Sequence, residues 1–164
     1  MPSRDSPGAT LRGAWLWAFP ITQALHGGEE YWAGYSFHRS LNRLSAFPVS
    51  ASHLFVLHCC FFLAMSLGVI LIQRQDRWSW LVSCLGVLVL VNGLIHLIQG
   101  FLLASYASGL ASGVILWIPL GSWSLWRSRS WDTRAKFWTG LLVGLGLEIP
   151  LAWIALNAGG ISAP

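Results

Sequence analysis

Long apolar runs dominate this chain, and short polar segments separate them. Five stretches come close to the about 20 mostly apolar residues that a membrane-spanning helix needs: residues 13–35, 51–73, 78–104, 110–126 and 137–158. The pattern predicts an all-α fold, a polytopic transmembrane bundle of about five helices that forms one domain over residues 1–164. No small-x-small cleavage pattern follows the first run, so we expect a retained helix and not a removed signal peptide.

Composition supports a surface that faces lipid. Charged residues make up 10% of the chain, against roughly 25% in ordinary soluble domains. The mean hydropathy is +0.59, so there is too little charge to cover a soluble domain of this size. The net charge of +4 comes from predicted loops and not from a basic soluble domain, so no nucleic-acid partner is expected.

The basic residues are distributed unevenly between the two predicted sides of the membrane. Eight of the ten Lys and Arg residues fall on one side, and only Arg39 and Arg43 fall on the other. Because basic loops stay on the cytoplasmic side, we predict a cytoplasmic N-terminus and an external C-terminus. The predicted location is the plasma (inner) membrane, as an integral multi-pass protein.

The ionisable residues inside the apolar runs suggest a site. All three glutamates and four of the five histidines fall within or at the end of predicted helices, whereas the aspartates fall in polar segments. An ionisable side chain inside a bilayer costs at least about 2.5 kcal/mol. We therefore expect a functional site that faces the interior of the bundle.

The first helix carries the most informative motif, His26-Gly-Gly-Glu29-Glu30. His26 and Glu30 are four residues apart and share one helix face, with Gln23 on the same stripe. An imidazole and a carboxylate one turn apart can both bind one metal ion, as the two histidines of HExxH sites do. The competing interpretation is a helix end with hydrated glutamates at the outer interface.

The third helix carries a second polar stripe. Asn92, His96 and Gln99 occupy positions i, i+4 and i+7 of an otherwise apolar run. Such residues also join membrane helices by simple hydrogen bonds. In the predicted topology His26, Glu30 and His96 lie in the outer half of the bilayer, so one shared cluster is possible. Whether His58 and Glu148 join it is left open.

These motifs resemble the HXXEE-motif family of integral membrane proteins. The resemblance covers roughly residues 15–125 and rests on His26-Gly-Gly-Glu29-Glu30, Asn92-Gly-Leu-Ile-His96 and Tyr106-Ala-Ser-Gly109. The family's last motif usually reads Tyr-x-Pro-Gly, and Ser108 stands in place of the proline. The resemblance implies a polytopic membrane protein with a possible metal-dependent activity, and it names no substrate.

The first hypothesis is a metal-dependent membrane hydrolase. His26, Glu30 and His96 would bind a divalent metal ion, with zinc favoured over iron or manganese because of the imidazole and carboxylate ligands. Glu29 would act as the general base. Asn92 and Tyr106 would orient the substrate or stabilise developing negative charge, and Glu148 is a further catalytic candidate. The expected partners are membrane lipid and a lipid or apolar small-molecule substrate.

Two other hypotheses use the same residues. In a metal-free cyclase or isomerase, Glu29, Glu30 and Glu148 would act as acids on an apolar substrate. In a non-enzymatic transporter or ion-binding protein, the carboxylates and imidazoles would relay protons or hold ions. The sequence leaves the substrate, the metal and the oligomeric state open.

Overall fold

The computed structural model describes residues 12–44, 51–103, 106 and 108–157, and this part of the chain is helical, with short connecting turns. A 3₁₀ turn, η2 (Ala14–Trp17), leads into the first helix, and η3 (Asp76–Trp78) precedes the third. The remaining elements are α1 (Ala18–Leu44), α2 (Ala51–Arg74), α3 (Leu81–Leu103), α4 (Leu110–Ser112), η4 (Gly113–Trp117), α5 (Ile118–Trp131) and α6 (Arg134–Asn157). Since α4, η4 and α5 run on as one helical segment, the described part of the chain forms five long helices.

The all-α class and the five helices are confirmed, but two predicted loops are wrong. Helix α1 continues to Leu44 and α5 to Trp131, so most of the predicted loops 36–50 and 127–136 is helical. The reason is that neither extension contains glycine or proline, and polar residues alone do not end a helix. The predicted helix ends at residues 104 and 158, and residues 45–50, lie outside the described part of the chain.

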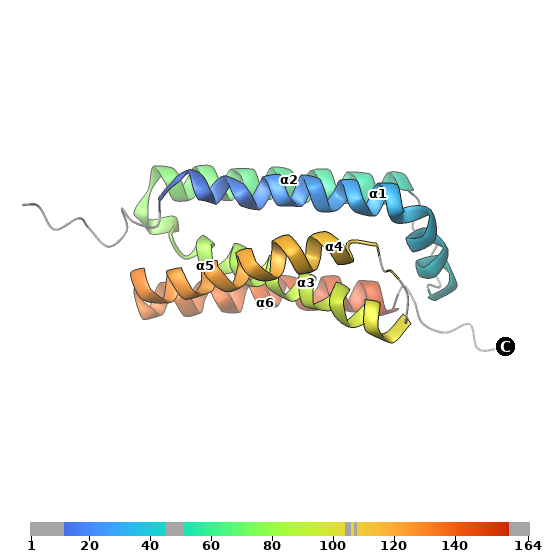
Figure 1. The fold of residues 1–164 in the computed structure, drawn as a ribbon. Helices are drawn as coiled ribbons and strands as arrows, with labels where there is room; N and C mark the ends of the chain where they lie inside the picture. The colour runs from blue at the N-terminus through green and yellow to red at the C-terminus, as the bar shows by residue number, and fades with distance from the viewer. Residues whose placement is uncertain (1–11, 45–50, 104–105, 107, 158–164) are drawn as a thin grey trace, which may run out of the picture.

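The helices form two layers (Figure 1). Helices α1 and α2 lie side by side in one layer, while α3 packs against both α5 and α6 in the other. Helix α3 is the centre of the fold, with an unbroken buried stretch from Val82 to Val89. A core of Leu16, Phe19, Val69, Ile72 and Val82 joins the two layers at the end away from the histidines.

Glycines bring the helices of the α3 layer close together. A Cβ on Gly121 would lie 2.6 Å from the carbonyl oxygen of Gly86, and one on Gly140 would lie 2.0 Å from that of Trp80. Small residues at helix crossings are typical of helices that pack in membranes. Any larger side chain at Gly121 or Gly140 would therefore force α5 or α6 away from α3.

Among the residues that the structure describes, two apolar helical segments are long enough to cross a membrane. They are Phe55–Arg74, with a mean hydropathy of 2.5, and Asp76–Leu102, with 2.4. These match the second and third predicted spans. The spanning of α1, α5 and α6, and the predicted orientation, stay predictions.

The segment from Leu110 to Trp131 contains a π-helical turn, η4, between α4 and α5. Pro119 follows it and lacks the N–H that would bond to the preceding turn, which lets that turn widen. Such π-turns inside α-helices are frequent at functional sites. Here the wide turn places Trp117 against α1, next to His26.

Candidate metal centre

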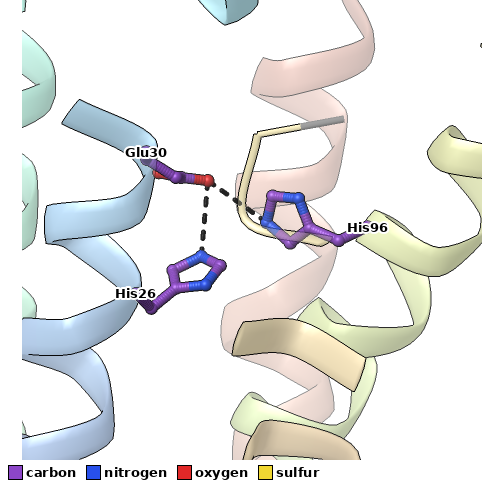
Figure 2. A group of neighbouring side chains, drawn as sticks. All are labelled: His26, Glu30 and His96. Atoms are coloured by element: carbon purple, nitrogen blue, oxygen red, sulfur yellow. Dashed lines mark ion pairs between the residues drawn. The ribbon is translucent and has the colours of Figure 1, made fainter. Parts of the chain in front are cut away.

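Three buried side chains from the two layers converge at one point (Figure 2). His26 Nε2 lies 3.3 Å from Glu30 Oε1, and His96 Nε2 lies 3.2 Å from the same oxygen. The one-turn spacing on α1 brings His26 and Glu30 together, and α3 supplies His96 from the opposite layer. The ligand atoms of all three residues lie within 4.8 Å of one another, so one cation can contact all three.

Gly109 covers this cluster. Its φ of +82° is a left-handed conformation that glycine adopts readily. A Cβ at this position would lie 2.6 Å from His26 Cε1, 2.8 Å from His96 Cε1 and 3.0 Å from Glu30 Oε1. The space between the three side chains is therefore kept open by the absence of a side chain on Gly109.

Ser112 and Trp117 fix the orientation of His26. Its Nδ1 lies 2.7 Å from Ser112 Oγ, which leaves Nε2 facing Glu30. The indole ring of Trp117 stacks on the imidazole with a centroid distance of 3.7 Å and an angle of 29°. Partners of this kind set the tautomer and ring plane of metal-binding histidines, so His26 is held ready to donate its Nε2 lone pair.

Glu30 is fixed by a third histidine, His58, which comes from α2. His58 Nε2 lies 2.6 Å from Glu30 Oε2, and Gln23 Nε2 lies 3.0 Å from His58 Nδ1. A Cβ on Gly27 would lie 3.0 Å from His58 Cγ, so this glycine allows His58 to approach α1. The row Gln23–His58–Glu30 leaves Oε1 as the carboxylate oxygen that faces His26 and His96.

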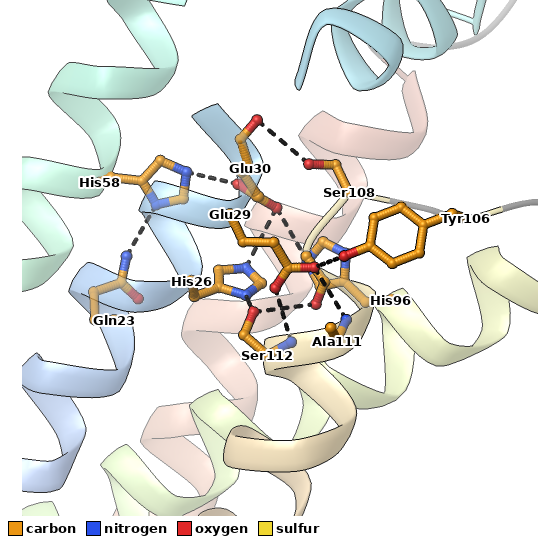
Figure 3. A network of polar contacts seen from close by, with 11 residues as sticks. Gln23, His26, Glu29, Glu30, His58, His96, Tyr106, Ser108, Ala111 and Ser112 are labelled. Atoms are coloured by element: carbon orange, nitrogen blue, oxygen red, sulfur yellow. Dashed lines mark hydrogen bonds and ion pairs between the residues drawn. The ribbon is translucent and has the colours of Figure 1, made fainter. Parts of the chain in front are cut away.

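Glu29 lies beside the cluster and caps another helix (Figure 3). Its Oε1 accepts a hydrogen bond of 3.0 Å from the amide of Ala111, and its Oε2 accepts one of 2.8 Å from the amide of Ser112. These amides belong to the first turn of α4, whose N-cap, Gly109, has no side chain of its own. Glu29 thus supplies from α1 the acceptor that the helix N-terminus lacks.

Two residues of the turn before α4 add contacts to the HXXEE motif. The hydroxyl of Tyr106 donates to Glu29 Oε1, and that of Ser108 donates to the backbone carbonyl of Glu30 at 3.3 Å. Partial burial and the neighbouring carboxylate of Glu29 raise the pKa of Tyr106, so its hydroxyl stays a hydrogen-bond donor at neutral pH. The contact from Ser108 is one that a proline could not make.

The structure separates two of the predicted catalytic residues from this cluster. Asn92 and Glu148 line a cavity together with Gln23 and Trp117. Asn92 is four residues before His96, so it faces the same side of α3 one turn away. Their predicted catalytic roles, like those of Glu29 and Tyr106, stay predictions.

The sequence indicates His26, Glu30 and His96 as candidate ligands but not most of the residues that support them. For His58 the sequence decides nothing, and it does not mark Ser112 or Trp117 as site residues. Ser112 gives no pattern signal, because a single serine in an apolar helix is common. For Trp117, the nearby Pro119 was the available signal of an irregular turn.

The donor set fits a metal ion. Two neutral imidazoles and one carboxylate form a typical ligand set for zinc and also suit iron or manganese. A preformed metal site requires open space between its ligands and ligands of fixed orientation. The space beneath Gly109 and the fixed orientation of His26 and Glu30 meet both requirements. Such an ion supplies Lewis acidity and lowers the pKa of a water molecule that it binds.

Fold and site together define an all-helical protein with two candidate membrane spans and a buried His/Glu cluster between its layers. The family model described as "Protein of unknown function with HXXEE motif" matches residues 17–124. The chain therefore belongs to the HXXEE family, as its motifs indicated. No curated protein and no solved structure matches the chain.

Proposed function

We propose that this protein is a metal-dependent membrane enzyme of the hydrolase type, with His26, Glu30 and His96 as the metal ligands. The observation that carries the proposal is the convergence of three buried ligand atoms within 4.8 Å beneath a glycine whose side chain would fill the site. Isolated core histidines have no need of such a space.

The exposed apolar surface supports the membrane part of the proposal. Only 22% of the α2 span is buried inside the protein, although its mean hydropathy is 2.5. The core helix of a soluble protein would be mostly buried. Large side chains such as Trp32, Phe101 and Leu102 are at least 77% exposed. Exposed apolar side chains of this size are suited to contact with lipid.

The proposed substrate is a lipid or another apolar molecule that enters from the bilayer. Tyr106 borders the site, is 56% exposed and holds its hydroxyl on Glu29. In this position it can orient a substrate that approaches the cluster between the layers. His58, which is itself bonded to Gln23, holds Glu30 from the α2 side, which keeps the ligand geometry fixed while a substrate is bound.

The surroundings of Glu29 and Glu30 favour hydrolysis over a metal-free mechanism in which these two residues act as acids. Around Glu29 the structure has two backbone amides and one hydroxyl, all hydrogen-bond donors. Glu30 contacts the Nε2 atoms of three imidazoles. Glu29 is therefore used as an acceptor, and Glu30 accepts from His58 through Oε2 while its Oε1 faces His26 and His96. An acid catalyst would need an oxygen free to donate a proton to the substrate.

The first test is the metal content of the full chain, purified in detergent without chelators and measured by elemental mass spectrometry. We expect near-stoichiometric metal in the wild type and its loss in His26→Ala and in His96→Ala. Leu94→Ala changes a 40% exposed position on α3, the helix that carries His96. This variant is the matched control and should keep the metal. Wild-type protein that stays metal-free after zinc, iron and manganese are added back would refute the ligand assignment.

The second test is activity. Wild-type protein in vesicles should hydrolyse an ester or amide bond of a lipid in a screen of such substrates. Activity that is lost on treatment with a strong chelator and restored by metal supports the proposal. Activity that survives complete removal of metal would contradict it and favour acid catalysis.

A further inference from the structure

A small cavity lies one helical turn from the metal centre. Gln23 precedes His26 by three residues on α1, and Asn92 precedes His96 by four on α3, so they lie about 4.5 Å and about 6 Å along their helices from a ligand. The cavity measures about 30 Å³. Its polar or hydrogen-bonding lining comes from α1, α3, η4 and α6 and consists of Gln23, Asn92, Trp117 and Glu148. Its apolar lining comes from α2 and α3 and consists of Phe61, Met65, Leu88 and Val89.

Two of these polar groups are buried without a partner. Trp117 is 2% exposed, and its Nε1 has no hydrogen-bond partner. Glu148 is 5% exposed, and no residue in the described part of the chain hydrogen-bonds to its carboxyl group. Buried polar groups in proteins are almost always paired with protein or with a bound molecule. Two such groups around one cavity therefore indicate an occupant.

The chemistry of the lining restricts that occupant. An indole N–H is only a donor, so the occupant must accept a hydrogen bond, which a cation cannot do. A carboxyl group keeps an acceptor oxygen whether or not it is ionised, so an occupant that also donates a hydrogen bond fits Glu148. The volume exceeds the roughly 10–15 Å³ that one water needs and is far below the roughly 300 Å³ of a pocket for a drug-sized ligand.

We propose that this cavity is a second binding site, distinct from the metal centre, and that it takes a hydroxyl group. The hydroxyl accepts from Trp117 Nε1 and donates to the carboxyl group of Glu148. It belongs either to a bound water molecule or to the alcohol group of an apolar substrate. Phe61 and Met65 would then contact the carbon chain of such a substrate.

Occupancy by a hydroxyl does not depend on the proposed function, but its use for substrate recognition does. A substrate hydroxyl held here would place the next part of the molecule about one helical turn away, beside His26 and His96. The substrate class that follows is a hydroxyl-bearing apolar molecule, with its reacting group near the metal centre and its alcohol in the cavity.

The test observes the indole N–H of Trp117 directly. The full chain is labelled with ¹⁵N-indole tryptophan in detergent, and Trp117→Phe identifies the resonance. A cross-peak between this N–H and water reports bound water. Titration with 1-butanol reports an alcohol, and diethyl ether, its isomer, is the matched probe because it accepts hydrogen bonds but cannot donate them.

We expect a water cross-peak, a saturable shift with 1-butanol, or both, and little response to diethyl ether. Glu148→Leu should remove the cross-peak and weaken 1-butanol binding about tenfold, as expected for one lost hydrogen bond. Glu148→Met, which also removes the carboxyl oxygens, serves the same comparison where the leucine variant does not fold. Leu147→Ala, at a 51% exposed position, should behave as the wild type.

Three results would overturn the proposal: an N–H that neither contacts water nor responds to 1-butanol, an equal response to ether, or an unchanged response in both Glu148 variants. Metal content separates this failure from that of the proposed function. A negative indole result with normal metal content refutes the hydroxyl site alone, whereas a positive result in protein that binds no metal refutes the metal centre alone.

Discussion

Replacement of Gly109 by alanine tests the metal centre most directly. The new Cβ would lie 2.6 Å from His26 Cε1 and 2.8 Å from His96 Cε1. Carbon atoms in contact prefer a separation of about 3.5–4.0 Å, so each imidazole must move by about 1 Å. Metal–ligand distances tolerate only about 0.2 Å. The displacement is therefore several times larger than a metal site accepts.

The expected result is a fall in metal affinity on the order of 100-fold, as for disrupted metal-site surroundings. The left-handed φ of +82° adds about 1–2 kcal/mol of backbone strain to the folded state of the alanine variant. Affinity is measured by competition with a chromophoric chelator in detergent, and stability by thermal unfolding of the metal-free protein.

Two variants distinguish the loss of space between the metal ligands from the backbone strain at residue 109. Gly109→Asn carries the same Cβ, but asparagine tolerates the left-handed region, so it should lose metal with a smaller loss of stability. Gly146→Ala is the matched control, because a Cβ there meets nothing within 4 Å. If Gly109→Ala or Gly109→Asn binds metal as tightly as the wild type, the missing side chain of Gly109 is not what keeps the metal site open.

Three further predictions concern the support of the cluster. Glu29→Gln should lower the free energy of unfolding by about 1–2 kcal/mol, because an amide cannot accept all the bonds that cap α4; a stable, metal-loaded but inactive variant would instead favour the general-base role. Tyr106→Phe removes one donor to Glu29 and should cost only about 1 kcal/mol by thermal unfolding, so a loss equal to that of Glu29→Gln would contradict the capping role. His58→Ala should weaken metal binding about 10- to 100-fold without abolishing it, and complete loss in chelator competition would make His58 a ligand.

The arrangement of donors and acceptors in one helix could be predicted from the sequence. The spacing of His26 and Glu30 places them on one face whatever surrounds them, because the helical period is a property of the backbone. The same holds for Asn92 and His96. Helix ends were less predictable, since residues 36–44 are mostly polar yet contain no helix-breaking residue.

The partners across the layers could not be predicted. Whether Glu29 is a base, a ligand or a cap depends on which groups lie opposite it, and the amides of Ala111 and Ser112 are more than 80 residues away in the chain. Backbone amides are the same in every sequence, so no residue pattern marks them. Glu148 likewise appeared to be a candidate for the cluster, but the packing of α6 on α3 puts it at the neighbouring cavity.

The sequence by itself determined that this is a helical HXXEE protein with apolar runs and a His/Glu motif, because composition and helical period are local properties. Only the tertiary structure decided that His26, Glu30 and His96 meet in one buried cluster, that Gly109 keeps it open, and that His58 and Glu29 serve it from either side. The physical reason is that a site between two layers depends on helix packing, and that packing is set by many distributed contacts of small and apolar side chains.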